Sequence, residues 1–217
     1  MSFEEPIFIV GCARSFTSLI AGTINICGVW GGEMGTPHPT NPKGFFENLD
    51  LRNLVTKPYL SRINADPRGQ FPLPDPNKIK LIDLKKQIYN VLKGQDYNDE
   101  LWFYKEPKLA PIWKTWNFSF PKAKWVIVRR ETDSIIQSVL HTNFMNRTLN
   151  SLEGCRRWVD YHVKCFTAIK ANCLSYEIWP ALALKGEFSP LKQLISDLNL
   201  NWDDKIYSFI ENKLVNF

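Results

Sequence analysis

Between Gly11 and Leu19 the chain reads Gly-Cys-Ala-Arg-Ser-Phe-Thr-Ser-Leu, directly after the apolar run Ile7–Val10. A strand that turns at once into a helix presents unpaired backbone N–H groups and the positive end of the helix dipole, which together attract anions. Side chains of the same stretch add hydroxyl donors and a permanent cation: Arg14, Ser15, Thr17 and Ser18. The stretch therefore predicts a loop that binds phosphate.

This loop differs from the loops that bind ATP or GTP. It lacks the ending Gly-Lys-[Ser/Thr], and no lysine occurs between Met1 and Thr40. Phe16 is unusual in such a turn, because a phenylalanine does not easily adopt a positive φ or allow the close approach of a ligand. We therefore expect either that the turn uses ordinary dihedral angles or that the Phe16 ring swings aside into a packed or substrate-facing position.

Glu47 is the best candidate for a general base. It follows Phe45 and Phe46, and we expect this aromatic pair to raise the pKa of the carboxyl group. Glu47 could instead begin a helix through Asn48–Tyr59 and complement the helix dipole. His38, which lies between two prolines in a loop, is the rival base.

Further cations follow two other apolar runs. Lys105, at the end of one run, could stabilise negative charge in a transition state, or it could form an ion pair with Glu106. Arg130 ends another run, and Ser138 comes eight residues later, so about two helical turns would bring Ser138 back to the strand end. Arg129 is one position early for this spacing, and it could point across the sheet.

The elements that position these residues alternate along the chain. Short apolar runs predict buried strands: Ile7–Val10, Leu101–Tyr104, Trp125–Val128 and Cys173–Tyr176. Helical patterns lie between and after them: Lys78–Leu92, with Leu81, Leu84, Ile88 and Val91 on one face, Asp133–Leu140, Ser151–Asn172 and Asp203–Leu214. This alternation predicts an α/β fold with a central, mostly parallel sheet.

Three loops could select a substrate: Trp30–Lys43, Asp66–Asn77 and Thr142–Asn150. Asp66–Asn77 contains four prolines, which exclude regular structure there. This segment could be a plain surface connection or a mobile lid, and its length favours the connection.

The composition is that of an ordinary globular protein. The 217 residues include 44% hydrophobic and 23% charged residues, and we expect one domain over residues 1–217. The net charge of +5 is spread along the chain, which weakly favours an anionic ligand, and no motif suggests nucleic-acid binding. His141 and His162 lack the spacing of metal ligands, so we expect no metal. The five cysteines are expected to be reduced.

We expect no targeting signal. Glu4 and Glu5 stand where a signal peptide needs basic residues, and no apolar run approaches the roughly 20 residues of a membrane span. We therefore expect a cytoplasmic protein with no membrane span. The sequons at Asn117 and Asn146 are then expected to be chance matches.

Taken in order, four segments resemble the motifs of sulfotransferases that use 3′-phosphoadenosine 5′-phosphosulfate (PAPS), in particular those of the bacterial type. The segments are Gly11–Leu19, Asn41-Pro-Lys-Gly-Phe-Phe-Glu47, Trp102-Phe-Tyr-Lys-Glu-Pro-Lys108 and Lys124–Ser138. The later stretches Leu174-Ser-Tyr-Glu-Ile-Trp-Pro180 and Leu191–Trp202 are similar to the family's closing segments. The resemblance spans nearly the whole chain.

This resemblance implies a three-layer α/β/α fold like that of the P-loop NTPases. It also implies transfer of a sulfuryl group from PAPS to a hydroxyl or amine of a small-molecule or glycan acceptor, without a metal, leaving 3′-phosphoadenosine 5′-phosphate (PAP). The implied catalytic residues are Arg14, Glu47 and Lys105. The implied cosubstrate-binding residues are Arg14, Ser15, Phe16, Thr17, Ser18, Leu19, Arg130 and Ser138. The last two match the family's site for the 3′-phosphate, so the resemblance implies a second phosphate site there.

The sequence departs from this family in three places. Phe16 replaces the usual glycine. Leu19 replaces the tryptophan that stacks on adenine in cytosolic members, so a stacking partner must come from elsewhere. Pro107 stands where those members have a catalytic histidine, two residues after Lys105, which favours Glu47 as the base. A nucleotide kinase and a catalytically silent nucleotide-binding protein of the same fold remain as alternatives.

Overall fold

Four parallel strands form the centre of the fold, in the order β2-β1-β3-β4. They are β1 (Ile7–Gly11), β2 (Phe103–Lys105), β3 (Lys124–Val128) and β4 (Ser175–Ile178). The computed structural model describes residues 3–35, 37, 41, 43–76, 78–146 and 148–211. The parallel sheet confirms the prediction, although β2 and β4 begin two residues later than expected, a shift that is common at the ends of a ladder.

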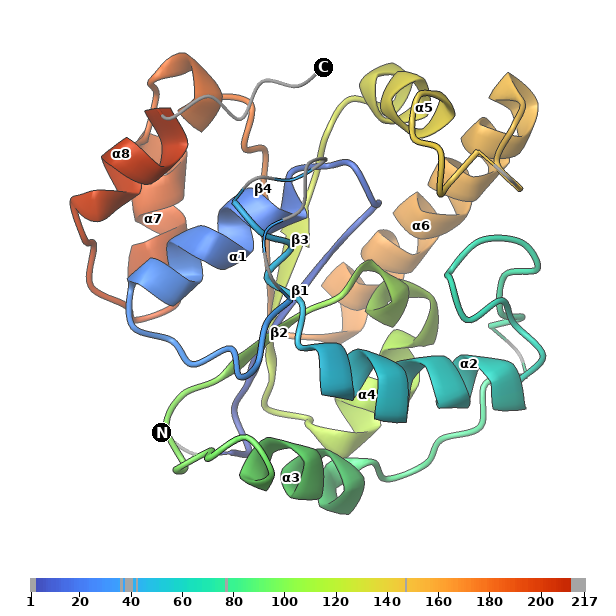
Figure 1. The fold of residues 1–217 in the computed structure, drawn as a ribbon, viewed down its shortest axis with the longest axis horizontal. Coiled ribbons are helices and arrows are strands. Elements are labelled where there is room, and N and C mark those ends of the chain that lie inside the picture. The colour runs from blue at the N-terminus through green and yellow to red at the C-terminus, as the bar shows by residue number, and fades with distance from the viewer. Residues whose placement is uncertain are drawn as a thin grey trace.

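Helices cover both faces of this sheet (Figure 1). Within β1, Phe8 and Val10 pack into one apolar cluster, whereas Ile7 and Ile9 pack into the cluster on the opposite face. A parallel strand that is covered on both sides needs such a continuous apolar run. The three-layer α/β/α architecture is thus confirmed.

The helical elements alternate with the strands. They are α1 (Thr17–Ile26), the π-helix η1 (Leu51–Thr56), α2 (Lys57–Arg62), α3 (Lys85–Lys93), the 3₁₀-helix η2 (Pro107–Ile112), α4 (Trp113–Ser119), α5 (Thr132–Leu140), α6 (Leu152–Asn172), the 3₁₀-helix η3 (Ala183–Lys185), α7 (Ser189–Asp197) and α8 (Lys205–Glu211). In Figure 1, α1, α7 and α8 lie on one side of the sheet, and α4 and α6 lie on the other.

The predicted helix Lys78–Leu92 is wrong in its first half, because α3 begins only at Lys85. Side chains from other elements bind the backbone before that point. The hydroxyls of Tyr59 and Thr115 donate to the carbonyl of Lys80, and the Leu84 N–H donates to Ser119. Leu81 is therefore exposed instead of facing the core.

The other helix predictions agree better with the structure. The helix predicted over Asp133–Leu140 is α5, and α6 begins after Ser151, whose hydroxyl accepts the Gly154 N–H at 3.1 Å. The last predicted helix is α8, and its expected end at Leu214 lies outside the described residues.

The proline-rich segment Asp66–Asn77 packs on α6. The indole N–H of Trp158 donates to the Gly69 carbonyl at 2.8 Å, and the Tyr161 hydroxyl donates to the Pro74 carbonyl at 2.6 Å. These bonds favour the surface connection over the lid; Asn77 itself lies outside the described residues.

No described helix has both the length and the apolar character that crossing a bilayer requires. All five cysteines are free thiols.

Candidate functional site

The turn after β1 is a tight loop that leads into α1. A Cβ atom on Gly11 would lie 2.7 Å from the Val128 carbonyl oxygen, so the start of the turn needs glycine. Arg14 and Phe16 both adopt left-handed backbone, with φ of 71° and 67°. The expectation of ordinary dihedral angles is therefore wrong. The alternative holds, because the Phe16 ring swings aside and packs below Arg130, whose guanidinium carbon lies 4.5 Å from the ring centroid.

The hydroxyl groups of the loop hold the loop itself together. Ser15, fully buried, donates to the Cys12 carbonyl at 2.6 Å. Ser18 donates to the Phe45 carbonyl and accepts from the Asn41 side chain, both at 3.2 Å. Ligand-facing donors must therefore come mainly from Arg14 and from the first backbone N–H groups of α1, which a helix does not use internally.

Two of the predicted contact residues are buried in this turn. Leu19 is 2% exposed and packs in the apolar cluster between the sheet, α1 and α7, so its side chain faces away from the loop surface. Thr17 is 4% exposed. A ligand could therefore contact these two residues only through their backbone or through a small part of the side chain.

Three predicted residues from three elements meet at this loop. The Arg14 side chain donates from Nε to the Ser138 hydroxyl of α5 at 2.9 Å. Arg130, just after β3, donates from Nη1 to the Arg14 backbone carbonyl at 2.8 Å. The two halves of the expected phosphate clamp therefore touch in this structure.

Arg14 and Arg130 are unpaired within the described part of the chain. No carboxylate there lies within ion-pair distance of either guanidinium, whereas the neighbouring Arg129 pairs with Glu177 across the sheet at 3.3 Å. Burial lowers the pKa of Arg14, and burial together with the charge of Arg14 lowers the pKa of Arg130. Both stay charged at neutral pH, so the loop carries two half-buried positive charges that no described carboxylate neutralises.

A second cluster centres on Glu47. Lys105 donates to one carboxylate oxygen at 2.6 Å, and Arg52 donates to the other at 2.9 Å. The Lys105 side chain is only 3% exposed. Lys105 ends β2 and pairs in register with Ile9 of β1. This cluster and the β1–α1 loop therefore lie at the same carboxyl edge of the sheet.

The pKa of Glu47 shifts opposite to our expectation. Burial raises it, but the positive charges of Lys105, Lys108 and Arg52 outweigh burial and lower it from 4.5 to about 2. The aromatic pair does not determine the pKa: the Phe46 ring packs edge-on against Phe209, with centroids 5.9 Å apart.

Neighbouring contacts bear on the alternatives for Glu47 and Lys105. The side-chain oxygen of Asn48, the residue after Glu47, accepts the Leu51 N–H at 3.0 Å. Glu106, fully buried, pairs with Lys108 at 2.7 Å, whereas Lys105 is buried and pairs with Glu47, so the alternative of an ion pair between Lys105 and Glu106 does not hold.

We predict a pH dependence of stability from Glu47. Because the folded protein lowers the pKa of this carboxyl, the ionised form stabilises the fold at pH values above about 4.5, and that stabilisation is lost as the pH falls toward about 2. Urea unfolding followed by circular dichroism between these pH values should show the loss. The variant Glu47→Gln should show a flatter dependence over the same window, and an unchanged slope would contradict the assignment.

Several other candidates lie outside the site or outside the described residues. His38 and part of the loop Trp30–Lys43 lie outside the described residues. His162 is buried and its Nδ1 lies 2.9 Å from the Trp158 carbonyl. In the described part of the chain, no group of histidine, cysteine, aspartate and glutamate residues could hold a metal ion.

The sequence interpretation missed two residues of this site. Arg52 comes from the first turn of the π-helix η1, which brings it back onto Glu47. Asn41 binds the Gly44 carbonyl at 2.6 Å and the Ser18 hydroxyl, and so docks its own loop on the β1–α1 turn. The position of Asn41 in a recognised segment was the available signal; the contact of Arg52 had none, because it depends on the π-helical turn.

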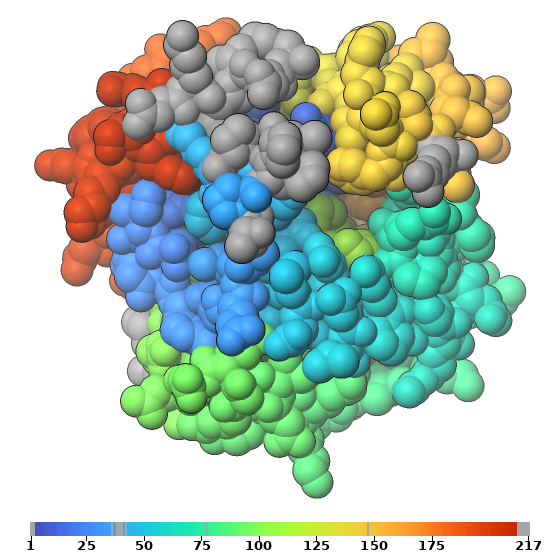
Figure 2. Space-filling view, in the orientation of Figure 1, coloured from blue at the N-terminus to red at the C-terminus, as the bar shows by residue number. Residues whose placement is uncertain are grey.

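The surface over these clusters is uneven. Figure 2 shows a recess between the yellow surface of α5 and the cyan surface of η1 and α2, with green atoms of the segment after β2 at its floor.

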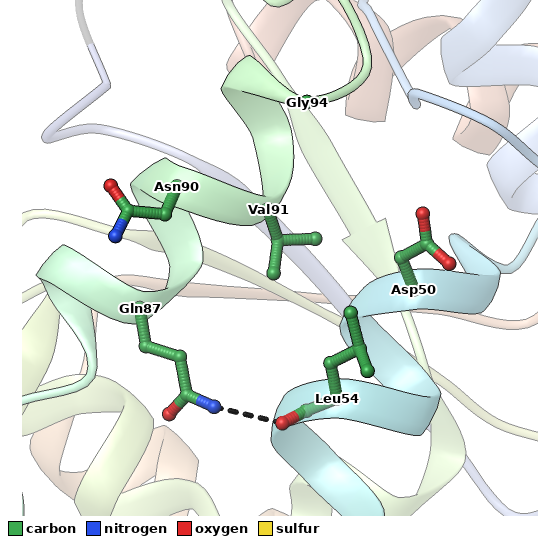
Figure 3. Close-up of a pocket in the computed structure, with 6 residues that line it drawn as sticks. All are labelled: Asp50, Leu54, Gln87, Asn90, Val91 and Gly94. Carbon is green, nitrogen blue, oxygen red and sulfur yellow. Dashed lines mark hydrogen bonds between the residues drawn. The ribbon is translucent and has the colours of Figure 1, made fainter.

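A separate hollow of about 410 Å³ lies between η1 and α3. Figure 3 shows its lining and the bond of 2.8 Å from Gln87 to the Leu54 carbonyl. No predicted site residue lines that hollow.

Solved structures share this arrangement of elements. Sulfotransferase STF9 from Mycobacterium avium superposes with a TM-score of 0.58 at 14% identity, over 98% of this chain and 68% of that chain. The sulfotransferase domain from the curacin biosynthetic pathway gives 0.58 at 16% identity, over 93% and 76%. The chain has the sulfotransferase fold.

Other comparisons agree with this fold or give no match. Sulfotransferase STF1 from Mycobacterium tuberculosis gives a TM-score of 0.56 at 13% identity, over 96% of this chain and 71% of that chain. Neither a protein-family model nor a curated protein sequence matches the chain. At these identities the sulfotransferase fold is shared, and the activity must be argued from the residues of the site.

Proposed function

We propose that this protein is a sulfotransferase that moves a sulfuryl group from PAPS to a hydroxyl or amine of a small-molecule or glycan acceptor. The observation that carries the proposal is the pair Arg14 and Arg130. The Arg130 guanidinium binds the backbone carbonyl of Arg14 in the turn before α1, and neither guanidinium has a carboxylate partner among the described residues. Two uncompensated cations beside free helix amides favour a ligand with more than one anionic group.

The donor site fits a nucleotide with phosphates at both ends. Arg14 and the first amides of α1 would hold the 5′-phosphate end, and Arg130 with Ser138 would hold the 3′-phosphate. The bond between Arg14 and Ser138, at 2.9 Å, keeps the two halves together. When bound, PAPS supplies an activated sulfuryl group, so the proposed reaction uses cationic side chains rather than a bridging magnesium ion.

The proposed catalytic roles follow from the two clusters. Arg14 stabilises negative charge on the oxygen that leaves the sulfuryl group, and Lys105 stabilises charge on the group in transfer. Glu47 accepts the proton of the acceptor. In the free protein Glu47 is a weak base, because Lys105 binds it at 2.6 Å. A turn of Lys105 toward the transferring group would free one oxygen of Glu47 and raise its basicity.

Ligand-induced stabilisation tests this proposal. We expect PAP to raise the thermal unfolding temperature more than ATP with magnesium at equal concentrations, because PAP carries the 3′-phosphate and needs no metal. At about 100 times its dissociation constant a ligand stabilises by about 2.7 kcal/mol, which is readily measured by differential scanning fluorimetry. Equal stabilisation, or a larger effect of ATP with magnesium, would contradict the proposal and favour a nucleotide kinase.

A catalytically silent nucleotide-binding protein is the second candidate. The observation that favours it is the low pKa of Glu47, about 2. Glu47 is therefore a weak base as long as Lys105 and Arg52 stay bound to its carboxylate. This candidate predicts that the protein binds PAP but does not consume PAPS, with any acceptor or with water.

A cytoplasmic location and the lack of nucleic-acid binding stay predictions.

A further inference from the structure

Phe16 occupies a backbone position that suits glycine. Its φ of 67° and ψ of 24° are left-handed, and bulky residues rarely adopt these angles. It is also the N-cap of α1 and provides no side-chain hydrogen bond to the helix. Neither the backbone nor the cap accounts for a phenylalanine here, so its reason must lie in what the ring contacts.

The guanidinium group of Arg130 lies over the Phe16 ring. The guanidinium carbon lies 4.5 Å from the ring centroid, within the range of a cation–π interaction. Among the described residues, the other contact of this guanidinium is the hydrogen bond that Nη1 donates to the Arg14 carbonyl at 2.8 Å. One hydrogen bond fixes a single nitrogen and permits rotation about it, whereas the ring adds a second contact that fixes the rest of the group.

The ring also offsets a repulsion. Arg14 and Arg130 bring two positive charges to one loop, and no described carboxylate neutralises them. The electron-rich face of an aromatic ring attracts a cation, and burial strengthens that attraction. Without the ring, Arg130 could move away from Arg14 toward solvent.

We propose that Phe16 is a positioning residue that orients Arg130 toward the 3′-phosphate of the donor nucleotide. Phe16 thereby sets the preference for a nucleotide with phosphates at both ends over one with a 5′-phosphate alone. This inference rests on the proposed function.

A purely structural role of Phe16 makes a different prediction. The ring also packs at the edge of the apolar cluster between the sheet, α1 and α7. If that packing were its whole role, removing the ring would weaken the binding of every nucleotide to the same extent. The ratio of two affinities therefore separates the two roles.

The experiment is isothermal titration calorimetry of the full chain with PAP and with adenosine 5′-monophosphate (AMP), which lacks only the 3′-phosphate. For Phe16→Leu, which keeps an apolar side chain without a ring face, we expect the preference for PAP over AMP to fall by about 5- to 30-fold. Phe16→Tyr keeps the ring and should retain the preference. Phe16→Gly suits the left-handed backbone and provides a second ringless variant if Phe16→Leu folds poorly.

Two arginine variants serve as the positive and negative controls for this measurement. Arg130→Ala should lower the same preference at least as much as Phe16→Leu does. Arg129→Ala removes a neighbouring charge that is already paired with Glu177, and it should leave the preference unchanged.

The outcomes separate the two proposals. If wild-type protein prefers PAP but the ringless variants keep that preference, or lose PAP and AMP affinity equally, the role of Phe16 is overturned and the proposed function stands. If wild-type protein binds PAP no better than AMP, the donor assignment fails, and the inference about Phe16 fails with it.

Discussion

Replacing Arg14 with alanine should slow sulfuryl transfer by about 10²–10³-fold, equivalent to about 2.7–4 kcal/mol in the transition state. The guanidinium group is held in place before the reaction by its bond to Ser138 at 2.9 Å, so it needs no reorganisation as negative charge develops. The substitution keeps the Arg14 backbone carbonyl that binds Arg130. The loss should therefore reflect the missing cation more than a collapse of the second phosphate site.

Conversion of PAPS to PAP, followed by chromatography, measures this effect even without an identified acceptor, because water can accept the sulfuryl group slowly. Arg156→Ala is the matched control, because Arg156 is exposed and pairs only with the exposed Asp133 in the described structure. It should leave the rate unchanged. A rate for Arg14→Ala within about threefold of the wild-type rate would show that Arg14 does not stabilise the transition state, since that is far from the loss expected of such a donor.

Replacing Glu47 with glutamine should lower turnover by about 10²–10⁴-fold, which is the contribution of a positioned general base. Glutamine has nearly the same shape but cannot take the proton of the acceptor. The low pKa of Glu47 adds a further expectation: the free enzyme should show no loss of kcat/KM from protonation of Glu47 between pH 5 and 8, because this carboxyl is ionised throughout that range.

Glu106→Gln provides the control for this variant. Glu106 is also a buried carboxylate paired with a lysine, but its partner is Lys108, and it caps η2. Both variants should be destabilised by loss of a buried ion pair, but only Glu47→Gln should lose turnover beyond its loss of folded protein. Near-normal turnover of folded Glu47→Gln, with an acceptor found by screening, would return the role of base to His38 or to the acceptor itself.

Much of the fold follows from the sequence, because local patterns specify it. The apolar runs give the strands of a sheet covered on both faces, and the stripe of α6 gives a helix that begins at the cap Ser151. The prediction fails where distant side chains replace local bonds. The first half of the predicted helix Lys78–Leu92 is not helical, because Tyr59, Thr115 and Ser119 bind its backbone.

The candidate site was also predicted only in part, because some of its contacts follow from local motifs and others depend on distant residues. Arg14, Arg130 and Ser138 were expected to form one clamp, and the structure brings them together. The pKa of Glu47 was predicted in the wrong direction, because adjacent aromatic residues suggested an apolar site. The charges that lower this pKa come from Arg52 and from the distant residues Lys105 and Lys108.

The sequence by itself determined which chemical groups this protein can use: a glycine turn, an arginine and hydroxyls after one strand, and an arginine and serine after another. Only the tertiary structure decided their partners. Lys105 pairs with Glu47, 58 positions away along the chain, instead of with its neighbour Glu106. Phe16 adopts left-handed backbone angles, and its ring lies against the guanidinium group of Arg130. Pairing energies depend on distance in space and on burial, and neither quantity is contained in the spacing of residues along a chain.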